Sequence, residues 1–322
     1  MARNIACVSR RNFIKKSSSV ALAVPLMPLV NPFNAEGGST NKGLQVHLFS
    51  KHLQFLDYDE MAKAAAKIGF DGLDLTVRPK GHVLPENVKR DLPKAVEAMK
   101  KYGLQTKMMT TNVLDAKIGA ERQVLETASN LGLTHYRTGW LTYPEGQTIL
   151  ESQEIYKALF KNLETANKEL NLIGCYQNHA GNHVGAPIWD LPPILPSRES
   201  KNLGAQYDIR HAVVEGGMSW ELDLRLIAPY IRSIVIKDFK WGMKAGKWQP
   251  INTPLGEGMV DFDRYFSLLK KYKINVPVSL HLEYDLGGAE HGATEITIDK
   301  EEVYAKMKKD LKFLKEAWNK AE

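Results

Sequence analysis

Eight strand-like segments alternate with amphipathic helical segments along this 322-residue chain, and this alternation limits the fold more than any other feature. Each strand-like segment is a short apolar run, and the segment after it has apolar residues at helical spacing. The first three helical segments end at glycine, a residue that commonly terminates helices. The expected strands cover residues 44–50, 70–77, 104–111, 133–139, 172–180, 204–212, 233–239 and 276–285.

This pattern favours a closed barrel. Strands that alternate with helices predict a parallel sheet, and eight such units are the number that closes a (β/α)8, or TIM, barrel of about 250 residues. A glycine-rich phosphate loop does not follow the first expected strand, so a nucleotide cofactor is not expected. We therefore expect an α/β protein with a single-domain TIM barrel over residues 36–322, and chemistry at the carboxyl ends of its strands.

Residues 1–35 have the pattern of an export signal. Arg10 and Arg11 precede an apolar run, Val20 to Val30, that is too short to span a bilayer. The stretch around the two arginines, SRRNFIK, resembles a bacterial twin-arginine signal. We expect a periplasmic or other extracytoplasmic location, with no membrane span in the mature chain.

The net charge of +6 does not indicate a nucleic-acid partner. Five basic residues and no acidic residue lie in the first 35 positions, which leaves about +1 for the remainder. The body of the chain has no stripe of Lys and Arg interleaved with aromatic residues. Only Cys175 remains beyond the signal, so neither a disulfide framework nor a cysteine zinc site is expected. A small molecule is the expected partner, and the oligomeric state stays open.

Polar residues gather where the expected strands end. Because successive side chains point to opposite faces of a strand, His281 and Glu283 share one face of the last strand. If that face points inward together with Lys237 and Asp208, the four side chains converge at one mouth of the barrel. Carboxylates with an imidazole nearby can bind a divalent metal or remove a proton next to a carbonyl.

Six segments, in order, carry a resemblance to a known family. They are FDGLDL (70–75), YQNHAG (176–181), YDIRHAVVEGG (207–217), IKDF (236–239), PLGEGMVDF (254–262) and SLHLEYD (279–285). In this order they resemble the xylose isomerase-like barrel superfamily, which includes sugar isomerases and epimerases, keto-sugar dehydratases and endonuclease IV-type enzymes. The resemblance implies a carbohydrate substrate.

It also implies a divalent metal (Mn, Zn, Co or Mg), which typical epimerases of the family hold with two glutamates, an aspartate and a histidine. Asp208 matches the aspartate, with His211 as its companion, and Glu283 matches the glutamate of the last strand. Gln177 stands where the family often has its other glutamate, and Val235 where it has the histidine. One alternative is therefore a pocket that works without metal. The other is an altered metal site, whose expected ligands are Asp208, Glu283, His179 and Gln177.

We expect an isomerase or epimerase that acts on a keto-sugar by enolisation. Epimerisation by paired glutamates lacks one base here, because Gln177 cannot accept a proton as a glutamate does. Glu283 is the expected base, with His179 or His211 as its acid partner. Lys237 is expected to stabilise the negative charge on the enolate oxygen.

Other residues are expected to contact the substrate. Arg78 and His82 follow the second expected strand and can bind an anion or a hydroxyl group. The full set of expected contacts is Arg78, His82, Asn178, Asp238, Glu257 and His281. Four tryptophans fall in expected loops, where a ring can stack on a sugar, but core packing is the better interpretation. They are Trp140, Trp189, Trp241 and Trp248.

Two alternative functions stay open. A keto-sugar lyase or hydratase shares the first proton removal, and a non-catalytic sugar-binding barrel is consistent with the replaced ligands at Gln177 and Val235. A nuclease is not expected, because the nine histidines do not reproduce the three-metal cluster of the endonuclease IV branch.

Overall fold

A closed barrel of eight parallel strands forms the body of the molecule. The strands are β1 (Val46–Phe49), β2 (Gly72–Thr76), β3 (Gln105–Thr110), β4 (His135–Arg137), β5 (Ile173–Gln177), β6 (Leu203–Asp208), β7 (Ile231–Ile236) and β10 (Val278–Leu280). They are hydrogen-bonded in the order β1-β10-β7-β6-β5-β4-β3-β2, and β1 pairs with β10 to close the ring. The expected single-domain TIM barrel is confirmed. The computed structural model describes residues 43–322, and the expected signal at residues 1–35 lies outside them.

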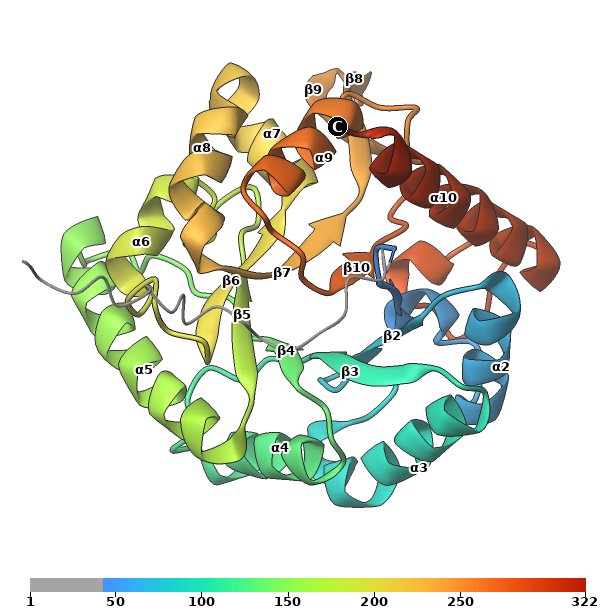
Figure 1. Ribbon diagram of the computed structural model, residues 1–322, viewed down its shortest axis with the longest axis horizontal. Helices are drawn as coiled ribbons and strands as arrows, with labels where there is room; N and C mark the ends of the chain where they lie inside the picture. The colour runs from blue at the N-terminus through green and yellow to red at the C-terminus, as the bar shows by residue number, and fades with distance from the viewer. Residues whose placement is uncertain (1–42) are drawn as a thin grey trace, which may run out of the picture. The chain divides into compact units, whose positions relative to one another are not determined.

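Helices surround the barrel, as Figure 1 shows. They are α2 (Tyr58–Ile68), α3 (Val88–Lys101), α4 (Gly119–Asn130), α5 (Ile149–Leu170), α6 (Leu191–Ile194), α7 (Ile209–Gly216), α8 (Trp220–Ile227), α9 (Phe262–Lys271) and α10 (Lys300–Lys320). Local signals set their ends: Asp57 caps α2 through the N–H of Glu60, and Gly69 ends it in the left-handed region with φ of 106°. Among the helices of residues 43–322, none has the length and apolar character needed to cross a membrane.

The interior of the barrel is polar near the ends of the strands. Asp74 on β2 accepts hydrogen bonds from Ser279 Oγ on β10 at 2.7 Å and from Thr110 Oγ1 on β3 at 3.0 Å. The neighbours of Asp74 along β2, Leu73 and Leu75, are buried on the opposite face of the strand. The outer, apolar face of the strand thus packs against the helices, while the inner face carries polar groups that can contact a ligand.

Strand β6 ends earlier than expected. It stops at Asp208 rather than continuing to residue 212, because the Asp208 carboxylate accepts a hydrogen bond from the backbone N–H of His211 at 3.2 Å and caps α7. His211 therefore lies in the first turn of a helix.

An antiparallel hairpin that the sequence pattern did not predict follows β7. It consists of β8 (Asp238–Lys244) and β9 (Lys247–Thr253). The turn residues Ala245 and Gly246 both have positive φ, 49° and 75°, as in the two-residue turns that suit the twist of a hairpin. Trp241 and Trp248 lie on this hairpin and are exposed, so the expectation that they pack in the core is wrong.

Candidate active site

Several strand ends bring polar side chains together at one mouth of the barrel. Gln177 and Asp208 are the last residues of the neighbouring strands β5 and β6. Lys237 directly follows β7, and Glu283 follows β10. Parallel strands of a barrel all end at the same rim, so residues far apart in the sequence meet there.

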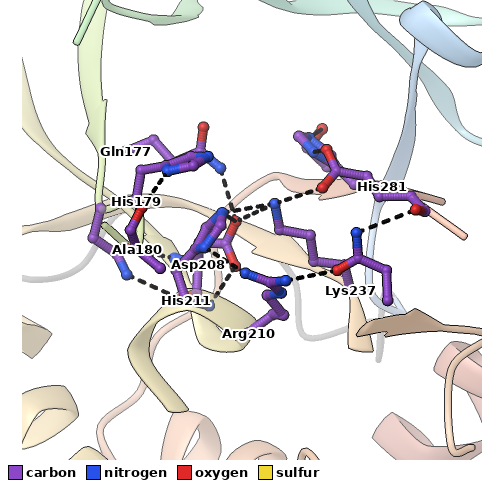
Figure 2. A network of polar contacts seen from close by, with 12 residues as sticks. Gln177, His179, Ala180, Asp208, Arg210, His211, Lys237 and His281 are labelled. Carbon is purple, nitrogen blue, oxygen red and sulfur yellow. Dashed lines mark hydrogen bonds and ion pairs between the residues drawn. The ribbon is translucent and has the colours of Figure 1, made fainter. Parts of the chain in front are cut away.

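Lys237 lies between two carboxylates. Its Nζ is 3.2 Å from Asp208 Oδ2 and 3.2 Å from Glu283 Oε2, and it is 2.8 Å from His211 Nε2. Figure 2 shows Lys237, Asp208 and His211 within one network of polar contacts. Only 4% of the Lys237 side chain is exposed. Because a buried ammonium group is tolerated only where it is paired, the surrounding side chains serve to hold this charge.

Asp208 is fully buried, and its carboxylate contacts other buried side chains and the backbone of α7. Its Oδ2 accepts a hydrogen bond from Gln177 Nε2 at 2.8 Å, and its Oδ1 accepts the His211 N–H that caps α7. Burial raises the pKa of Asp208, and the ammonium group of Lys237 opposes that rise. Asp208 therefore anchors Lys237 and the start of α7 from behind the cavity.

Glu283 is the carboxylate that faces the open space of the mouth. Its side chain is 25% exposed, and its Oε1 lies 3.2 Å from Lys51 Nζ while its Oε2 faces Lys237. Burial alone raises its pKa, but the ammonium groups of Lys237 and Lys51 outweigh burial and hold the pKa well below its usual range. Glu283 is therefore ionised at neutral pH.

A cavity of about 90 Å³ opens beside Glu283. This is smaller than typical ligand pockets. A larger hollow of about 520 Å³ lies at the opposite end of the barrel, around Gln45, Lys107 and Arg232, but in this fold chemistry occurs at the carboxyl ends of the strands. The residues that line the cavity are aromatic, basic or polar. They are Phe49, Lys51, Arg78, Arg137, Trp140, Gln177, His179, Lys237, His281 and Glu283.

Two histidines of the lining are neutral. His281 stacks on Phe49 with ring centres 4.2 Å apart, and burial together with Lys237 lowers its pKa to about 3. His179 donates from Nδ1 to the carbonyl oxygen of Ala180 at 2.9 Å, and burial together with Lys237 lowers its pKa to about 4. Both rings can therefore form hydrogen bonds with a substrate, but they do not carry positive charge at neutral pH.

His211 was expected to act on the substrate, but it lies outside the cavity lining. Its ring lies between Lys237 Nζ and Arg210 Nη1, at 2.8 and 3.1 Å. Burial, reinforced by Lys237, holds its pKa well below the usual range. A buried neutral imidazole in this place helps to position Lys237.

Two expected substrate contacts hold the backbone instead. The Asn178 amide pairs with the backbone of Asp208, accepting its N–H at 2.7 Å and donating to its carbonyl oxygen at 3.0 Å. The Asp238 carboxylate lies outside the cavity lining and orders the loop after β9. It accepts backbone hydrogen bonds from Phe239, Gly256, Gly258 and Val260. The expectation of a substrate contact at Asp238 is not supported, because both oxygens are already occupied.

Two further expected contacts also lie outside the lining. His82 joins the ends of β1 and β2: its Nδ1 is 3.1 Å from Ser50 Oγ and its Nε2 is 3.2 Å from Leu53 O. Glu257 forms an ion pair with Lys309 at 2.7 Å, and both side chains are largely exposed. Surface pairs of this kind contribute little to stability.

The expected site omitted Lys51 and Arg137, which line the cavity. Lys51 lies in η1 (Ser50–Leu53), directly after β1, and Arg137 is the last residue of β4. Strand alternation gives no signal for Lys51, because it lies beyond the end of β1 at Phe49. Trp140 lines the cavity as well, and the guanidinium carbon of Arg137 lies 4.1 Å from the centre of its ring.

Comparisons with known proteins agree with this architecture. The sequence profile of the xylose isomerase-like TIM barrel matches residues 62–317. The chain belongs to this family. Among curated proteins, none matches the chain.

Several solved structures resemble the chain in fold at low sequence identity. D-allulose 3-epimerase from Methylomonas sp. superimposes with a TM-score of 0.61 at 15% identity, covering 85% of this chain and 98% of that one. The 3-keto-D-glucoside 4-epimerase from E. coli has a TM-score of 0.60 at 13% identity, with 85% and 99% covered. A xylose isomerase-like TIM barrel protein from Mycobacterium smegmatis, solved in complex with magnesium, has a TM-score of 0.60 at 10% identity, with 85% and 98% covered.

The metal site that the xylose isomerase-like family implies does not fit the residues of this chain. The ammonium group of Lys237 lies 3.2 Å from both carboxylates and already supplies them with a positive charge. Gln177 directs its NH₂ group, a donor, at Asp208. In residues 43–322, no three His, Cys, Asp or Glu side chains are close enough to hold a metal ion. Asp208, Glu283 and Gln177 instead belong to a network centred on Lys237, and the ligand set of Asp208, Glu283, His179 and Gln177 stays a prediction.

Proposed function

We propose that this chain is an enzyme that removes a proton next to the carbonyl group of a keto-sugar, as a sugar isomerase or epimerase does. One observation carries the proposal: Glu283 lies at the cavity between the ammonium groups of Lys51 and Lys237, 3.2 Å from each. Enolisation needs a base and a positive charge near the carbonyl oxygen. The family and the fold neighbours named as sugar epimerases support the same class of reaction.

The proposed step uses residues of the chain alone. Glu283 takes the proton from the carbon, the electron pair of the C–H bond forms the C=C bond of an enolate, and the carbonyl oxygen gains a negative charge. Lys51 and Lys237 then divide their attraction between Glu283 and this oxygen, which raises the proton affinity of Glu283 as the reaction proceeds. The hydroxyl proton on the deprotonated carbon then moves to the enolate oxygen, and return of the abstracted proton from Glu283 to the former carbonyl carbon gives the isomer.

Gln177 limits what this site can do. Its amide donates to Asp208 Oδ2 at 2.8 Å and accepts from Arg137 Nη1 at 3.4 Å, so it is a neutral group held on both sides. It cannot act as a second base on the other face of the sugar. A single base suffices for isomerisation, and it also suffices for β-elimination from the enolate. A keto-sugar lyase or hydratase is therefore the second candidate.

Proton exchange in D₂O tests the proposal. The full chain is incubated with D-allulose, D-tagatose and D-fructose, and NMR follows the loss of the proton next to the carbonyl and the formation of products. We expect Glu283→Gln to slow exchange by about 10²- to 10⁴-fold. The control Glu302→Gln removes an exposed glutamate on α10 that pairs with Lys306, and it should leave the rate unchanged. Wild-type exchange in Glu283→Gln would refute the role of this base, and a new unsaturated product would indicate the lyase.

A further inference from the structure

Two arginines at the cavity have no carboxylate partner. Arg78 follows β2 and Arg137 ends β4, and both line the cavity. Among residues 43–322, no Asp or Glu oxygen lies within 4.0 Å of either guanidinium group. Lys51 and Lys237, by contrast, both pair with Glu283. The cavity lining thus contains four cations and one carboxylate.

The guanidinium group of Arg137 is buried and only partly hydrogen-bonded. Its Nη2 donates to Thr111 O at 3.2 Å and its Nη1 donates to Gln177 Oε1 at 3.4 Å, and both acceptors are neutral. Its Nε has no hydrogen-bond partner in the described part of the chain, although only 3% of the residue is exposed. Burial, together with Arg78, lowers the pKa of Arg137 to about 9. An anion beside this group would offset the cost of burying its charge.

Arg78 has even fewer contacts. Its buried Nε has no hydrogen-bond partner among the described residues, and its guanidinium carbon lies 5.7 Å from the centre of the Phe49 ring. Asp74 attracts it from beyond ion-pair distance. The Asp74 oxygens already accept hydrogen bonds from Ser279 and Thr110. The free N–H groups of Arg78 are therefore available to a ligand.

Arg137 lies across the mouth from the base, and Arg78 lies between them, because β2 is two places from both β4 and β10 in the ring of strands. In the ring of eight strands, β4 lies four places from β10, which is directly across the barrel. Arg137 ends β4, and Glu283 follows β10. A molecule that spans the cavity can therefore contact Arg137 at one end and the base at the other, with Arg78 along its length.

We propose that Arg78 and Arg137 form an anion subsite, and that the substrate is an acidic sugar whose carboxylate or phosphate group binds there while its keto end lies at Glu283. This inference rests on the proposed function for the position of the reacting carbon. Guanidinium groups bind carboxylate and phosphate through their N–H donors, and within residues 43–322 the Nε–H of each arginine has no hydrogen-bond partner.

Two matched sets of compounds test the subsite. D-Fructose, D-fructuronate and D-fructose 6-phosphate differ only at carbon 6, which is neutral, a carboxylate or a phosphate ester. D-Glucitol and D-gluconate are a neutral polyol and its acid, and their binding to the full chain is measured by calorimetry without any turnover. Calorimetry tests the subsite even if the proposed reaction does not occur, because binding of D-gluconate and D-glucitol requires no proton removal.

We expect D-gluconate to bind at least about 10-fold more tightly than D-glucitol, because charge-assisted hydrogen bonds are the strong ones. Arg78→Gln should reduce that preference about 10-fold or more, and Arg137→Gln should do the same if it folds. The control Arg122→Gln removes a partly exposed arginine on α4 that pairs with Glu126 and Glu169, and it should keep the preference. A preference for fructuronate or for the 6-phosphate in proton exchange identifies which anion is bound. Equal binding of gluconate and glucitol, or a preference that survives Arg78→Gln, overturns the subsite.

Discussion

Replacement of Lys237 by methionine tests whether the mouth is built around this ammonium group. Each of its two contacts at 3.2 Å is worth about 5 kcal/mol of gross attraction at an effective dielectric constant of about 20. Most of that attraction is offset by the desolvation of the charges. Lys237→Met leaves Asp208 fully buried without its counter-charge, and removing one partner of a buried pair costs about 3–5 kcal/mol.

Urea unfolding of the full chain, followed by tryptophan fluorescence, measures this loss. The double variant Asp208→Asn, Lys237→Met should recover part of it, because no unpaired charge then remains. Without Lys237 the pKa of Asp208 rises further above its unfolded value, so the folded variant binds that proton more tightly and regains stability as the pH falls. The control Lys309→Met breaks the exposed pair with Glu257 and should cost less than about 1 kcal/mol. A loss in Lys237→Met no larger than in this control would refute the reasoning.

Three further predictions concern the metal, a buried carboxyl group and the loop at the rim. Dialysis against EDTA should leave proton exchange unchanged, and a loss of rate that Mn²⁺ restores would show that a cation takes part. Burial raises the pKa of Asp310 to about 7, so the folded chain holds this proton more tightly than the unfolded chain and stability falls as the pH rises from about 4 to about 7. Asp310→Asn should remove this dependence and stabilise the chain at pH 8 by on the order of 4 kcal/mol, which urea unfolding at pH 5 and pH 8 checks. A Cβ at Gly258 would lie 2.2 Å from Asp238 Oδ1, so Gly258→Ala should lower stability by about 1–3 kcal/mol, and an unchanged urea midpoint would contradict that.

The barrel could be predicted because strands and helices impose different periods on the sequence. Buried strands are short and apolar, the helices have one apolar face, and eight repeats of this pattern match one closed architecture. The hairpin of residues 238–253 could not be predicted in the same way. Much of it is exposed, so its residues do not follow the pattern of a buried strand.

The position of the site could be predicted better than its chemistry. Alternation along the last strands indicated that Lys237 and Glu283 meet, and the same alternation places Asp238, the neighbour of Lys237, on the opposite face. The ion pair of Glu283 with Lys51 depends on a turn after β1, and the free Nε of Arg137, which has no partner in residues 43–322, depends on what surrounds it. Such contacts arise between distant segments, and local spacing does not encode them.

The central positive charge of this network is a side chain, Lys237, rather than a separately bound ion. A bound metal is a separate component with its own supply and affinity, whereas Lys237 is synthesised with the chain in a fixed ratio of one to one. In the proposed metal-free site this charge is in place when the barrel closes, and neither a chelator nor a competing ion can remove it. That charge is single where a divalent ion has two, so in the proposed reaction the remaining stabilisation of an enolate would come from neighbouring groups such as Lys51.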